Sequence, residues 1–369
     1  MKRIIVQALK EWAEFRRDRL SLALALILPL ATLLLFGYGV RLKASNIPLV
    51  VQDMDNSRMS RSLVDGLLAT NVFASGDWNQ RSDPEDVLED GGARAAVVIP
   101  PGFGRDLQML RPVSFQTLID GSDLTSAEMV RAAVRGATSI FLYLNLPPDP
   151  HRLYVQPHMR IWFNPGSKEA LFIVPGVFAI ILWMYPALLA AVAIAREIEQ
   201  STIVQVYASD MSALEALLGK ALFYLLVGLA QALLILVVAH LLFGLTLQCT
   251  CGPLVLCSVI YVAGAVFFGL LAGIISKHQT VAVQAAATGG FFPALLLSGF
   301  VYPIRNIPFP LSLACDVVPA RYYIEVCRDA FMRGLGWRSV WYEPLILTAF
   351  ALVLLTGSWM RMRRMQVED

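Results

Sequence analysis

The 56 residues 221–276 contain no Asp, Glu, Lys or Arg. Soluble domains have about a quarter of their residues charged, so a core of this kind is not built in water. A bilayer is the solvent that such a stretch requires, because helices satisfy their own backbone polar groups there. The whole chain agrees, with 57% hydrophobic and 16% charged residues among 369. The sequence therefore predicts a polytopic α-helical membrane protein.

Six apolar segments are long enough to cross a bilayer at about 1.5 Å per helical residue. They are residues 20–40, 170–195, 221–243, 253–276, 278–304 and 344–360. Pro29 lies near the middle of the first and is expected to kink it. In the fifth, Gly289, Gly290, Pro293 and Gly299 indicate either irregular backbone lining a cavity or helix packing through small residues.

Residues 1–19 have the pattern of an amphipathic helix. One face is apolar, and the other leaves basic side chains to water or lipid phosphate. The apolar residues are Ile4, Ile5, Ala8, Leu9, Trp12 and Phe15, and the basic ones are Lys2, Lys10, Arg16, Arg17 and Arg19. A helix lying in the membrane interface fits this pattern. A signal peptide is the rival, but the following run is too long and lacks a small-residue cleavage site.

Basic residues indicate the orientation. Six Lys or Arg precede the first span, Lys277 lies in one short loop, and the turn at 244–252 has none. With six spans, both termini are then cytoplasmic and residues 41–168 lie outside. The outer segment 305–343 is an exception with five arginines.

Ion pairs within one helix would explain that exception. Arg321–Glu325 and Asp329–Arg333 have i,i+4 spacing, and Glu325–Arg328 has i,i+3 spacing. The opposite face would be apolar and would dip into the outer leaflet. It consists of Tyr322, Tyr323, Val326, Ala330 and Phe331.

Residues 41–168 have ordinary polarity and alternate between strand and helix patterns. Strands are expected at 47–53, 95–100 and 113–120, with strand character again at 152–163. Helices are expected at 57–70, at 83–90, after Pro101 and at 122–144, the first capped by Asn56 or Ser57. This pattern predicts a small α/β domain with a mixed sheet, inserted between the first two spans.

The chain has no recognisable catalytic or metal-binding motif. Cys249, Cys251 and Cys257 lack a fourth ligand, so small packing residues at a membrane turn are the favoured interpretation. Gly219-Lys220 resembles the end of a phosphate-binding loop. However, Ala221 replaces the magnesium-binding Ser or Thr, and Leu214 replaces the first glycine. We expect no enzyme activity and no cofactor on this chain, and no basic stripe suggests a nucleic-acid partner.

The segment 196–220, REIEQSTIVQVYASDMSALEALLGK, resembles the signature R-E-x-E-x-G-T…E-x-x-x-G-K of ABC-2 type transporter permeases. Residue types alone leave open that these charges are only solvated helix ends. A second segment, LLLSGFVYPIRNIPFPLSLACDVVPARYYIEVCRDAFMRG, is similar to the family's L-S-G-F-x-x-P…P-x-x-Y-x-x-x-x-R run. One span, a large outer domain and five further spans resemble the drug-export-type permeases of Gram-negative bacteria. The resemblance covers essentially the whole chain.

The resemblance implies roles for three groups of residues. A coupling helix within 196–220 would contact the ATPase through Arg196, Glu197, Glu199, Thr202, Glu215 and Lys220. An outer gate would contain Leu297, Ser298, Gly299, Phe300, Tyr302 and Pro303. A re-entrant region at 305–335 would include Arg321, Tyr322, Glu325 and Arg328. Ser201, Val204 and Asp210 depart from the family's pattern.

The resemblance further implies the membrane subunit of an ATP-binding cassette exporter in the bacterial inner membrane. It would move amphiphilic or hydrophobic cargo, with ATP and magnesium bound on separate ATPase subunits. A second copy or a related permease would complete the dimer, lipid would surround it, and a periplasmic adaptor remains an open partner. Two alternatives remain open: a complex that transmits force without transport, and an ATP-independent channel or carrier.

Overall fold

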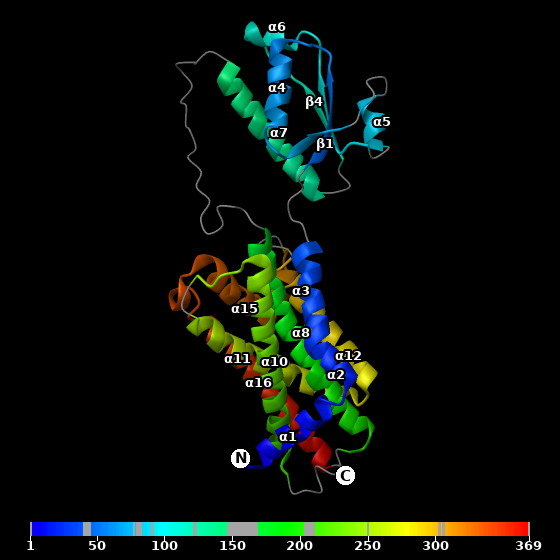
Figure 1. Ribbon diagram of the computed structural model, residues 1–369, viewed down its shortest axis with the longest axis vertical. Helices are drawn as coiled ribbons and strands as arrows, with labels where there is room; N and C mark the ends of the chain where they lie inside the picture. Colours follow the sequence, from blue (N-terminus) through cyan, green and yellow to red (C-terminus); the bar gives the residue numbers. More distant parts are fainter. Residues whose placement is uncertain are drawn as a thin grey trace. The chain divides into compact units, whose positions relative to one another are not determined.

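The structure is a computed structural model. It describes residues 2–39, 46–76, 78, 83–89, 92–120, 124–145, 169–202, 211–248, 251–301, 304 and 307–367. The chain forms two compact units (Figure 1). The helical unit comprises Met1–Val40 and Arg160–Asp369, and the α/β unit comprises Arg41–Met159. The strand character expected at 152–163 lies outside the described residues.

Within the described residues, five helical segments are long and apolar enough to cross a membrane. They are Arg19–Gly39, Ala170–Glu199, Ala213–Phe243, Gly252–Ser276 and Glu343–Arg364. This confirms a multi-pass helical membrane protein. The segment expected as a further span, 278–304, is not among the five.

α8 (Glu169–Glu199) is the central helix of the helical unit (Figure 1). In the most apolar 18-residue stretch of α8, 89% of the residues are buried, compared with 22% in the corresponding stretch of the first span. α3 (Leu28–Gly39), α10 (Ala213–Phe243) and α11 (Gly252–Ser276) pack against it. α16 (Glu343–Val367) packs mainly against α11.

Small residues allow α8 and α11 to approach closely. A Cβ added at Gly269 would overlap the backbone carbonyl of Ala187, and one at Gly273 would lie 2.5 Å from the carbonyl oxygen of Ala191. The glycines are four residues apart on α11, and the alanines are four apart on α8, so they form facing stripes. The hydrophobic effect does not drive helices together in lipid, so close van der Waals packing of this kind is a principal cause of their association.

The first span follows α1 (Lys2–Phe15) and is irregular before Pro29. It consists of α2 (Arg19–Leu22), a π-helical turn at Ala23–Ile27, and α3. Pro29 has no N–H to donate to the carbonyl of Ala25. The Gln231 side chain on α10 donates to that carbonyl instead, at 2.9 Å. The irregularity expected at Pro29 is therefore a π turn with a side-chain donor from a neighbouring helix.

The fifth apolar segment is shorter than expected. It consists of α12 (Gln279–Ala286), a π turn at Ala287–Phe291 and α13 (Phe292–Leu296). The helix does not reach residue 304 as expected: α13 ends at Leu296, and Gly299 in the turn that follows adopts a left-handed backbone with φ +80°.

Short helices follow this segment. α14 (Leu311–Asp316) precedes α15 (Pro319–Arg328), which continues into a π turn at Asp329–Arg333. Tyr323, Val326, Ala330 and Phe331 of this helix are buried, so the expected apolar face packs within the helical unit.

The α/β unit contains a four-stranded mixed sheet of order β2-β1-β3-β4. The strands are β1 (Ile47–Asp53), β2 (Phe73–Ser75), β3 (Ala95–Ile99) and β4 (Gln116–Ile119). β1 pairs parallel with β2 and β3, and β4 is antiparallel to β3. Sequence patterns do not indicate β2, which has only three residues.

The helices of this unit are α4 (Arg58–Leu68), α5 (Pro84–Glu89), α6 (Phe103–Gln108) and α7 (Leu124–Asn145). Ser57 caps α4 through a hydrogen bond from the backbone N–H of Ser60, at 3.1 Å. Asp55 accepts backbone N–H groups of Gly102 at 2.7 Å and Gly104 at 2.9 Å, and so holds the start of α6 against β1. α4 and α7 pack together over the apolar core.

The close contact of α8 with α11 predicts a large effect for Gly269→Ala. The added methyl group overlaps backbone, which cannot move aside as a side chain can, and overpacking typically costs about 1–3 kcal/mol. We expect a lower unfolding temperature for the purified chain in detergent. Gly264→Ala on the same helix is the matched control, since its nearest neighbour would lie 3.6 Å away. Equal unfolding temperatures for the two variants would contradict this packing.

Candidate functional site

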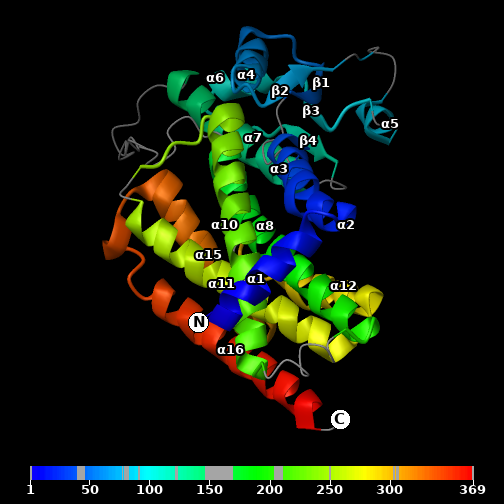
Figure 2. The same ribbon diagram turned by 60° about the horizontal axis from the view of Figure 1, so that its bottom comes forward.

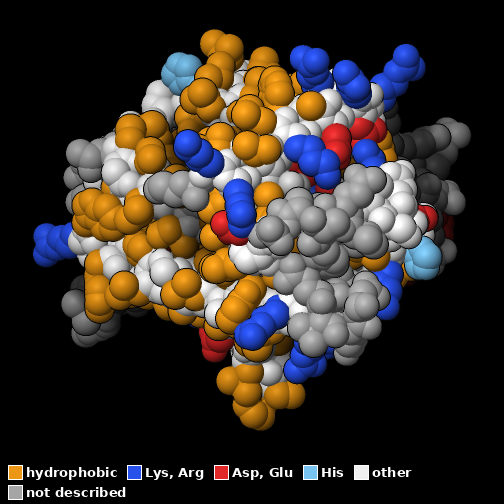
Figure 3. Space-filling model, turned by 90° about the horizontal axis from the view of Figure 1, so that it is seen from below, with side chains coloured by type: hydrophobic (Ala, Val, Ile, Leu, Met, Phe, Trp, Pro, Cys, Tyr) orange, Lys and Arg blue, Asp and Glu red, His pale blue; other side chains and the backbone are white. Residues whose placement is uncertain are grey.

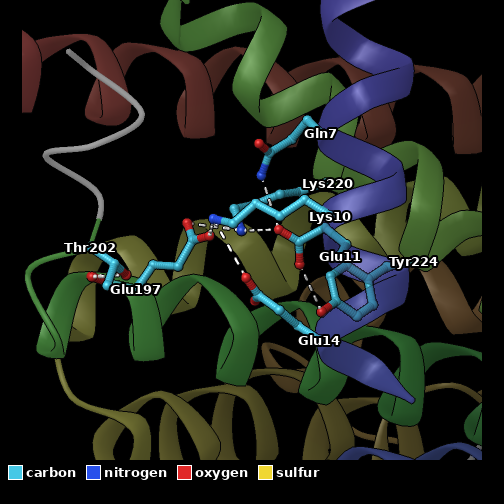
Figure 4. A network of polar contacts seen from close by, with 8 residues as sticks. All are labelled: Gln7, Lys10, Glu11, Glu14, Glu197, Thr202, Lys220 and Tyr224. Atoms are coloured by element: carbon cyan, nitrogen blue, oxygen red, sulfur yellow. Dashed lines mark hydrogen bonds and ion pairs between the residues drawn. The ribbon is translucent and has the colours of Figure 1, made fainter. Parts of the chain in front are cut away.

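A cluster of charged and polar side chains lies where α1 crosses the ends of α8 and α10 (Figures 2 and 4). We call it the polar cluster. It consists of Gln7, Lys10, Glu11, Glu14, Glu197, Lys220 and Tyr224. These side chains come from the last turn of α8, the first turns of α10, and α1, which is far from both in the sequence.

Lys220 is the centre of the polar cluster. Its side chain is 1% exposed, and its ammonium group contacts a carboxylate oxygen of Glu11 and Oε2 of Glu197, the latter at 2.9 Å. Glu11 and Glu197 are also buried. Lys10 supplies the second positive charge, with Nζ 2.8 Å from Oε1 of Glu197. Two cations thus balance two buried carboxylates, which is the condition for holding charges away from water.

The carboxylate of Glu11 also accepts hydrogen bonds from two uncharged side chains. Gln7 donates through Nε2 to Oε1 at 3.0 Å, and the hydroxyl group of Tyr224 donates to Oε2 at 3.1 Å. Glu14 is exposed and lies 3.6 Å from Lys10. The contacts that hold α1 in place therefore reach both α8 and α10 (Figure 4).

Helical spacing brings these side chains together. Gln7 and Glu11 are four residues apart on α1, and Lys220 and Tyr224 are four apart on α10, so each pair shares one face. Gly219 permits the approach, because a Cβ there would lie 2.6 Å from the side chain of Gln7. The sequence Gly-Lys is thus part of a helix contact, inside α10 rather than in a loop.

Arg196 ties α8 to the start of the first span. Its Nη2 lies 2.5 Å from Oδ2 of Asp18, and its Nε donates to Oε1 of Gln279 at 3.3 Å. Asp18 also accepts the backbone N–H of Leu20 and the hydroxyl group of Ser21, and thereby caps α2.

Asp18 and Lys10, which lie beside the end of α8 and outside the spans, have shifted pKa values. Burial acts to raise the pKa of Asp18, but hydrogen bonds from Ser21 and Arg196 and the charge of Arg196 outweigh it, so the pKa is lowered. Burial acts to lower the pKa of Lys10, but its hydrogen bond and charge interaction with Glu197 outweigh it, so the pKa is raised. The stabilisation from Asp18 is therefore complete above about pH 4 and that from Lys10 below about pH 10, and both are present at neutral pH.

The other expected coupling residues terminate helices at the same end of the unit. Thr202 donates through Oγ1 to the carbonyl of Glu197, at 3.2 Å. Glu199 accepts the backbone N–H and the side-chain amide of Gln279, both at 3.1 Å, and so caps α12. Glu215 forms a capping box with Ser212 at the start of α10.

The structure brings Glu197 and Lys220 together but buries both, so their charges meet α1 instead of the surface. Their side chains are thus positioned to act on α1. The segment 203–210, where a separate coupling helix with Val204 and Asp210 is expected, lies outside the described residues.

A polar groove opens beside the polar cluster. Its volume is about 520 Å³, and its lining is Lys10, Glu14, Arg17, Asp18, Arg196, Glu197, Gln200 and Thr202. Of these, Glu14, Arg17 and Gln200 are exposed. This surface presents both charge signs next to the end of α8.

Sequence reasoning missed the α1 half of the site. The expectation that Lys10 faces only water or phosphate is wrong, because Lys10 pairs with Glu197. The pairing of Glu11 with Lys220 is unexpected, because the two residues lie 209 positions apart in the sequence. Two features of the sequence could nonetheless have indicated this contact. Lys220 directly precedes the uncharged run and needs an internal counter-charge, and Gln7 and Glu11 form a polar i,i+4 pair beside apolar residues.

The expected outer-gate residues form a turn after α13. Ser298, Gly299 and Phe300 are buried, and Leu297 lines an apolar cavity of about 580 Å³. The ring of Phe300 occupies the space beside Gly176 of α8. Tyr302 and Pro303 lie outside the described residues.

The expected re-entrant residues lie close to this turn. Nη2 of Arg328 donates to the carbonyl of Gly299 at 3.0 Å. One cavity of about 520 Å³ is lined by Gly299, Arg321, Tyr322 and Glu325 together with Arg328, Ile304, Tyr342 and Glu343. The structure thus groups the two sets that the resemblance names separately.

One of the three expected ion pairs forms in this region, Glu325–Arg328 at 3.7 Å. Arg321 pairs with Asp316 instead of Glu325, because α14 ends at Asp316 just before α15 begins.

Asp329 also departs from the expected pairing. It is buried and accepts the backbone N–H of Gly336 at 2.8 Å, so Arg333 pairs with Glu325 at 3.2 Å. Asp329 therefore binds a backbone N–H of the following turn, where its i,i+4 spacing predicts an ion pair with Arg333.

Neither candidate metal ligand set has the features of a metal site in the part of the chain described. Cys251 is an exposed free thiol, Cys257 is a buried one, and Cys249 lies outside the described residues. Glu11, Glu14 and Glu197 bring carboxylates close together, but Lys10 and Lys220 already balance them.

Comparisons with known proteins cover nearly the whole chain. Residues 19–360 match the family model described as ABC-2 family transporter protein. The chain is 25% identical over 367 residues to the probable multidrug ABC transporter permease YbhS of Escherichia coli, covering 98% of this chain and 97% of that protein. It is 25% identical over 350 residues to the probable multidrug ABC transporter permease YbhR of the same organism, covering 92% and 93%. ABC transporter G family member 20 of Dictyostelium discoideum is 20% identical over 94% of this chain and 48% of its own length.

The polar cluster predicts strong destabilisation by Lys220→Met. Removing one partner leaves Glu11 and Glu197 facing each other in a buried site, and breaking a buried ion pair costs about 3–5 kcal/mol. We expect a lower unfolding temperature in detergent and faster tryptic cleavage in α1. Lys277→Met, at an exposed lysine, is the control.

A second substitution tests the cause. Adding Glu11→Gln to Lys220→Met removes the surplus charge and leaves the Lys10–Glu197 pair, so most of the lost stability should return. Lys220→Met unfolding at the temperature of Lys277→Met, or no recovery in the double variant, would contradict the role of the cluster.

Proposed function

This chain belongs to the ABC-2 transporter family, and we propose that it is the membrane subunit of an exporter energised by a separate ABC ATPase. Two copies, or this chain and a related one, would form the transmembrane dimer with two ATPase subunits. The names of its relatives support a transporter subunit. Spans that carry so little charge favour amphiphilic or hydrophobic cargo.

The polar cluster is the observation that carries this proposal. The family-type signature residues Glu197 and Lys220 hold α1 to the ends of α8 and α10. A buried, charge-balanced contact resists separation, since pulling it apart exposes unpaired charges. Force applied to the segment between α8 and α10 is therefore transmitted to α1.

The path continues from α1 into the first span. Arg196 binds Asp18, the residue that caps α2, so the end of α8 and the start of this span are tied directly. ATP binding would close the ATPase dimer, displace the ends of α8 and α10, and carry the first span with them. Such a change requires the ATPase to interact differently with the two states of the membrane subunit.

Gly219 and Lys220 are already engaged within the chain and do not form a nucleotide site. Gly219 packs on Gln7, and the ammonium group of Lys220 is bound by two carboxylates. ATP and magnesium would instead be held by the partner subunit.

The basic residues favour cytoplasmic termini and an outer location for the α/β unit, in a bacterial inner membrane. The polar groove and the polar cluster would then face the cytoplasm, where an ATPase acts. An α/β unit outside would be available to a periplasmic adaptor.

Co-purification tests the proposal. The tagged chain, extracted from its native membranes in mild detergent, should bring down an ABC ATPase. Glu14→Arg with Gln200→Arg changes exposed groove residues and should lower its recovery about tenfold, as expected for the loss of about 1.4 kcal/mol of binding. Glu128→Arg, at an exposed acid of the α/β unit, is the control.

Other outcomes favour the alternatives. An ATP-independent channel or carrier is indicated if no ATPase is recovered and dye export persists after ATP depletion. A force-transmitting complex is indicated if the ATPase binds and hydrolyses ATP in liposomes while no amphiphilic dye moves.

A further inference from the structure

A second groove lies between α1 and α10, and it is almost entirely apolar. Its volume is about 400 Å³. α1 contributes Ile5, Ala8, Leu9 and Trp12, and α10 contributes Leu222, Phe223, Leu226, Val227 and Ala230. The indole ring of Trp12 meets the ring of Phe223 edge-on, with centroids 6.2 Å apart.

The groove is open to the surroundings of the helical unit. Ile5 is 55% exposed, Leu9 62% and Trp12 52%. On α10 the exposed residues Leu222 and Leu226 continue along the helix in an apolar stripe. That stripe includes Leu233 and Val237. A chain of methylene groups that enters beside α1 can therefore continue along a membrane span.

Positive charge lies at one end of the groove. The backbone N–H of Arg16 donates to the carbonyl of Trp12 at 3.2 Å, so the helical path continues and places Arg16 one turn beyond Trp12 on the same face. Arg16 and Arg19 are both exposed. Figure 3, which views the molecule from below, shows Lys and Arg side chains among hydrophobic ones on that face.

We propose that this groove binds an anionic phospholipid, with an acyl chain between α1 and α10 and the headgroup phosphate at Arg16 and Arg19. The charge and the apolar lining together select this occupant. An apolar floor that ends in cations complements a molecule with a long apolar tail and a negative head. Trp12 lies at the boundary between the two parts, where amphipathic aromatic rings are favoured.

A second copy of the chain fits the same surface less well. Packing this face against itself about a two-fold axis would bring two α1 helices together. Each exposes Arg16, Arg17 and Arg19 at this end, and Glu14 is the exposed acid beside them. The like charges would repel each other, whereas an anionic lipid neutralises them.

Quenching of Trp12 fluorescence by brominated lipid tests the proposal on the full chain. The chain and its Trp12→Phe variant are reconstituted in phosphatidylcholine vesicles that contain about 20% brominated phosphatidylglycerol or about 20% brominated phosphatidylcholine. The difference between chain and variant isolates the contribution of Trp12. We expect brominated phosphatidylglycerol to quench the Trp12 fluorescence about threefold more strongly than brominated phosphatidylcholine does.

The arginines should determine this preference. Arg16→Gln with Arg19→Gln should lower the ratio to about one. Arg361→Gln with Arg364→Gln removes the same charge from exposed positions at the end of α16 and should leave the ratio unchanged. Thermal unfolding of each variant checks that it is folded.

Three results would overturn the proposal. Equal quenching by the two lipids in the unaltered chain indicates ordinary boundary lipid. Absence of quenching by either lipid indicates a groove closed by protein, as in a self-association interface. A preference for phosphatidylglycerol that survives Arg16→Gln with Arg19→Gln indicates that the charge acts from elsewhere.

Discussion

A lysine at the start of an apolar helix must find negative charge inside the protein, and much of the architecture of the helical unit follows from this requirement. Lys220 is fully buried, and the acids that reach it come from α1 and from the end of α8. Gly219 lets α1 approach closely enough, and Lys10 balances the surplus carboxylate. α1 is consequently more than an interfacial helix resting on lipid. It is joined to two membrane spans by contacts that are costly to break.

The same principle recurs deeper in the first span, where an irregularity of the backbone has a polar partner on a neighbouring helix. Pro29 leaves the carbonyl of Ala25 without its helical donor, and Gln231 supplies one from α10. The first span is thus connected to α10 directly through this hydrogen bond and indirectly through α1. An ATPase acting on the ends of α8 and α10 would therefore act on the first span as well, which links the family's mechanism to particular contacts in this chain.

Much of the secondary structure is predictable, because it depends on local composition and periodicity. The uncharged runs locate the long spans, and β1, β3 and the helices of the α/β unit follow from their apolar patterns. Partners distant in the sequence are not predictable in this way. The identity of the acid that meets Lys220 depends on how α1 docks, and the partner of Arg321 depends on where α14 ends. The fifth apolar segment ends its helix at Leu296, before a turn that contains the left-handed Gly299, and hydropathy does not register this end.

The central claim is that α1 and the end of α8 move as one body, and an interspin distance tests it most directly. With the five native cysteines replaced, spin labels at Ala13 of α1 and at Ser201, just after the end of α8, report the distance between these elements, and both positions are exposed and outside the lining of the polar groove. In the complex with its ATPase, the account predicts the same narrow distance distribution without nucleotide and with ATP trapped by vanadate. Lys220→Met should broaden it. A distribution that shifts on ATP trapping in the otherwise unaltered chain would contradict the claim.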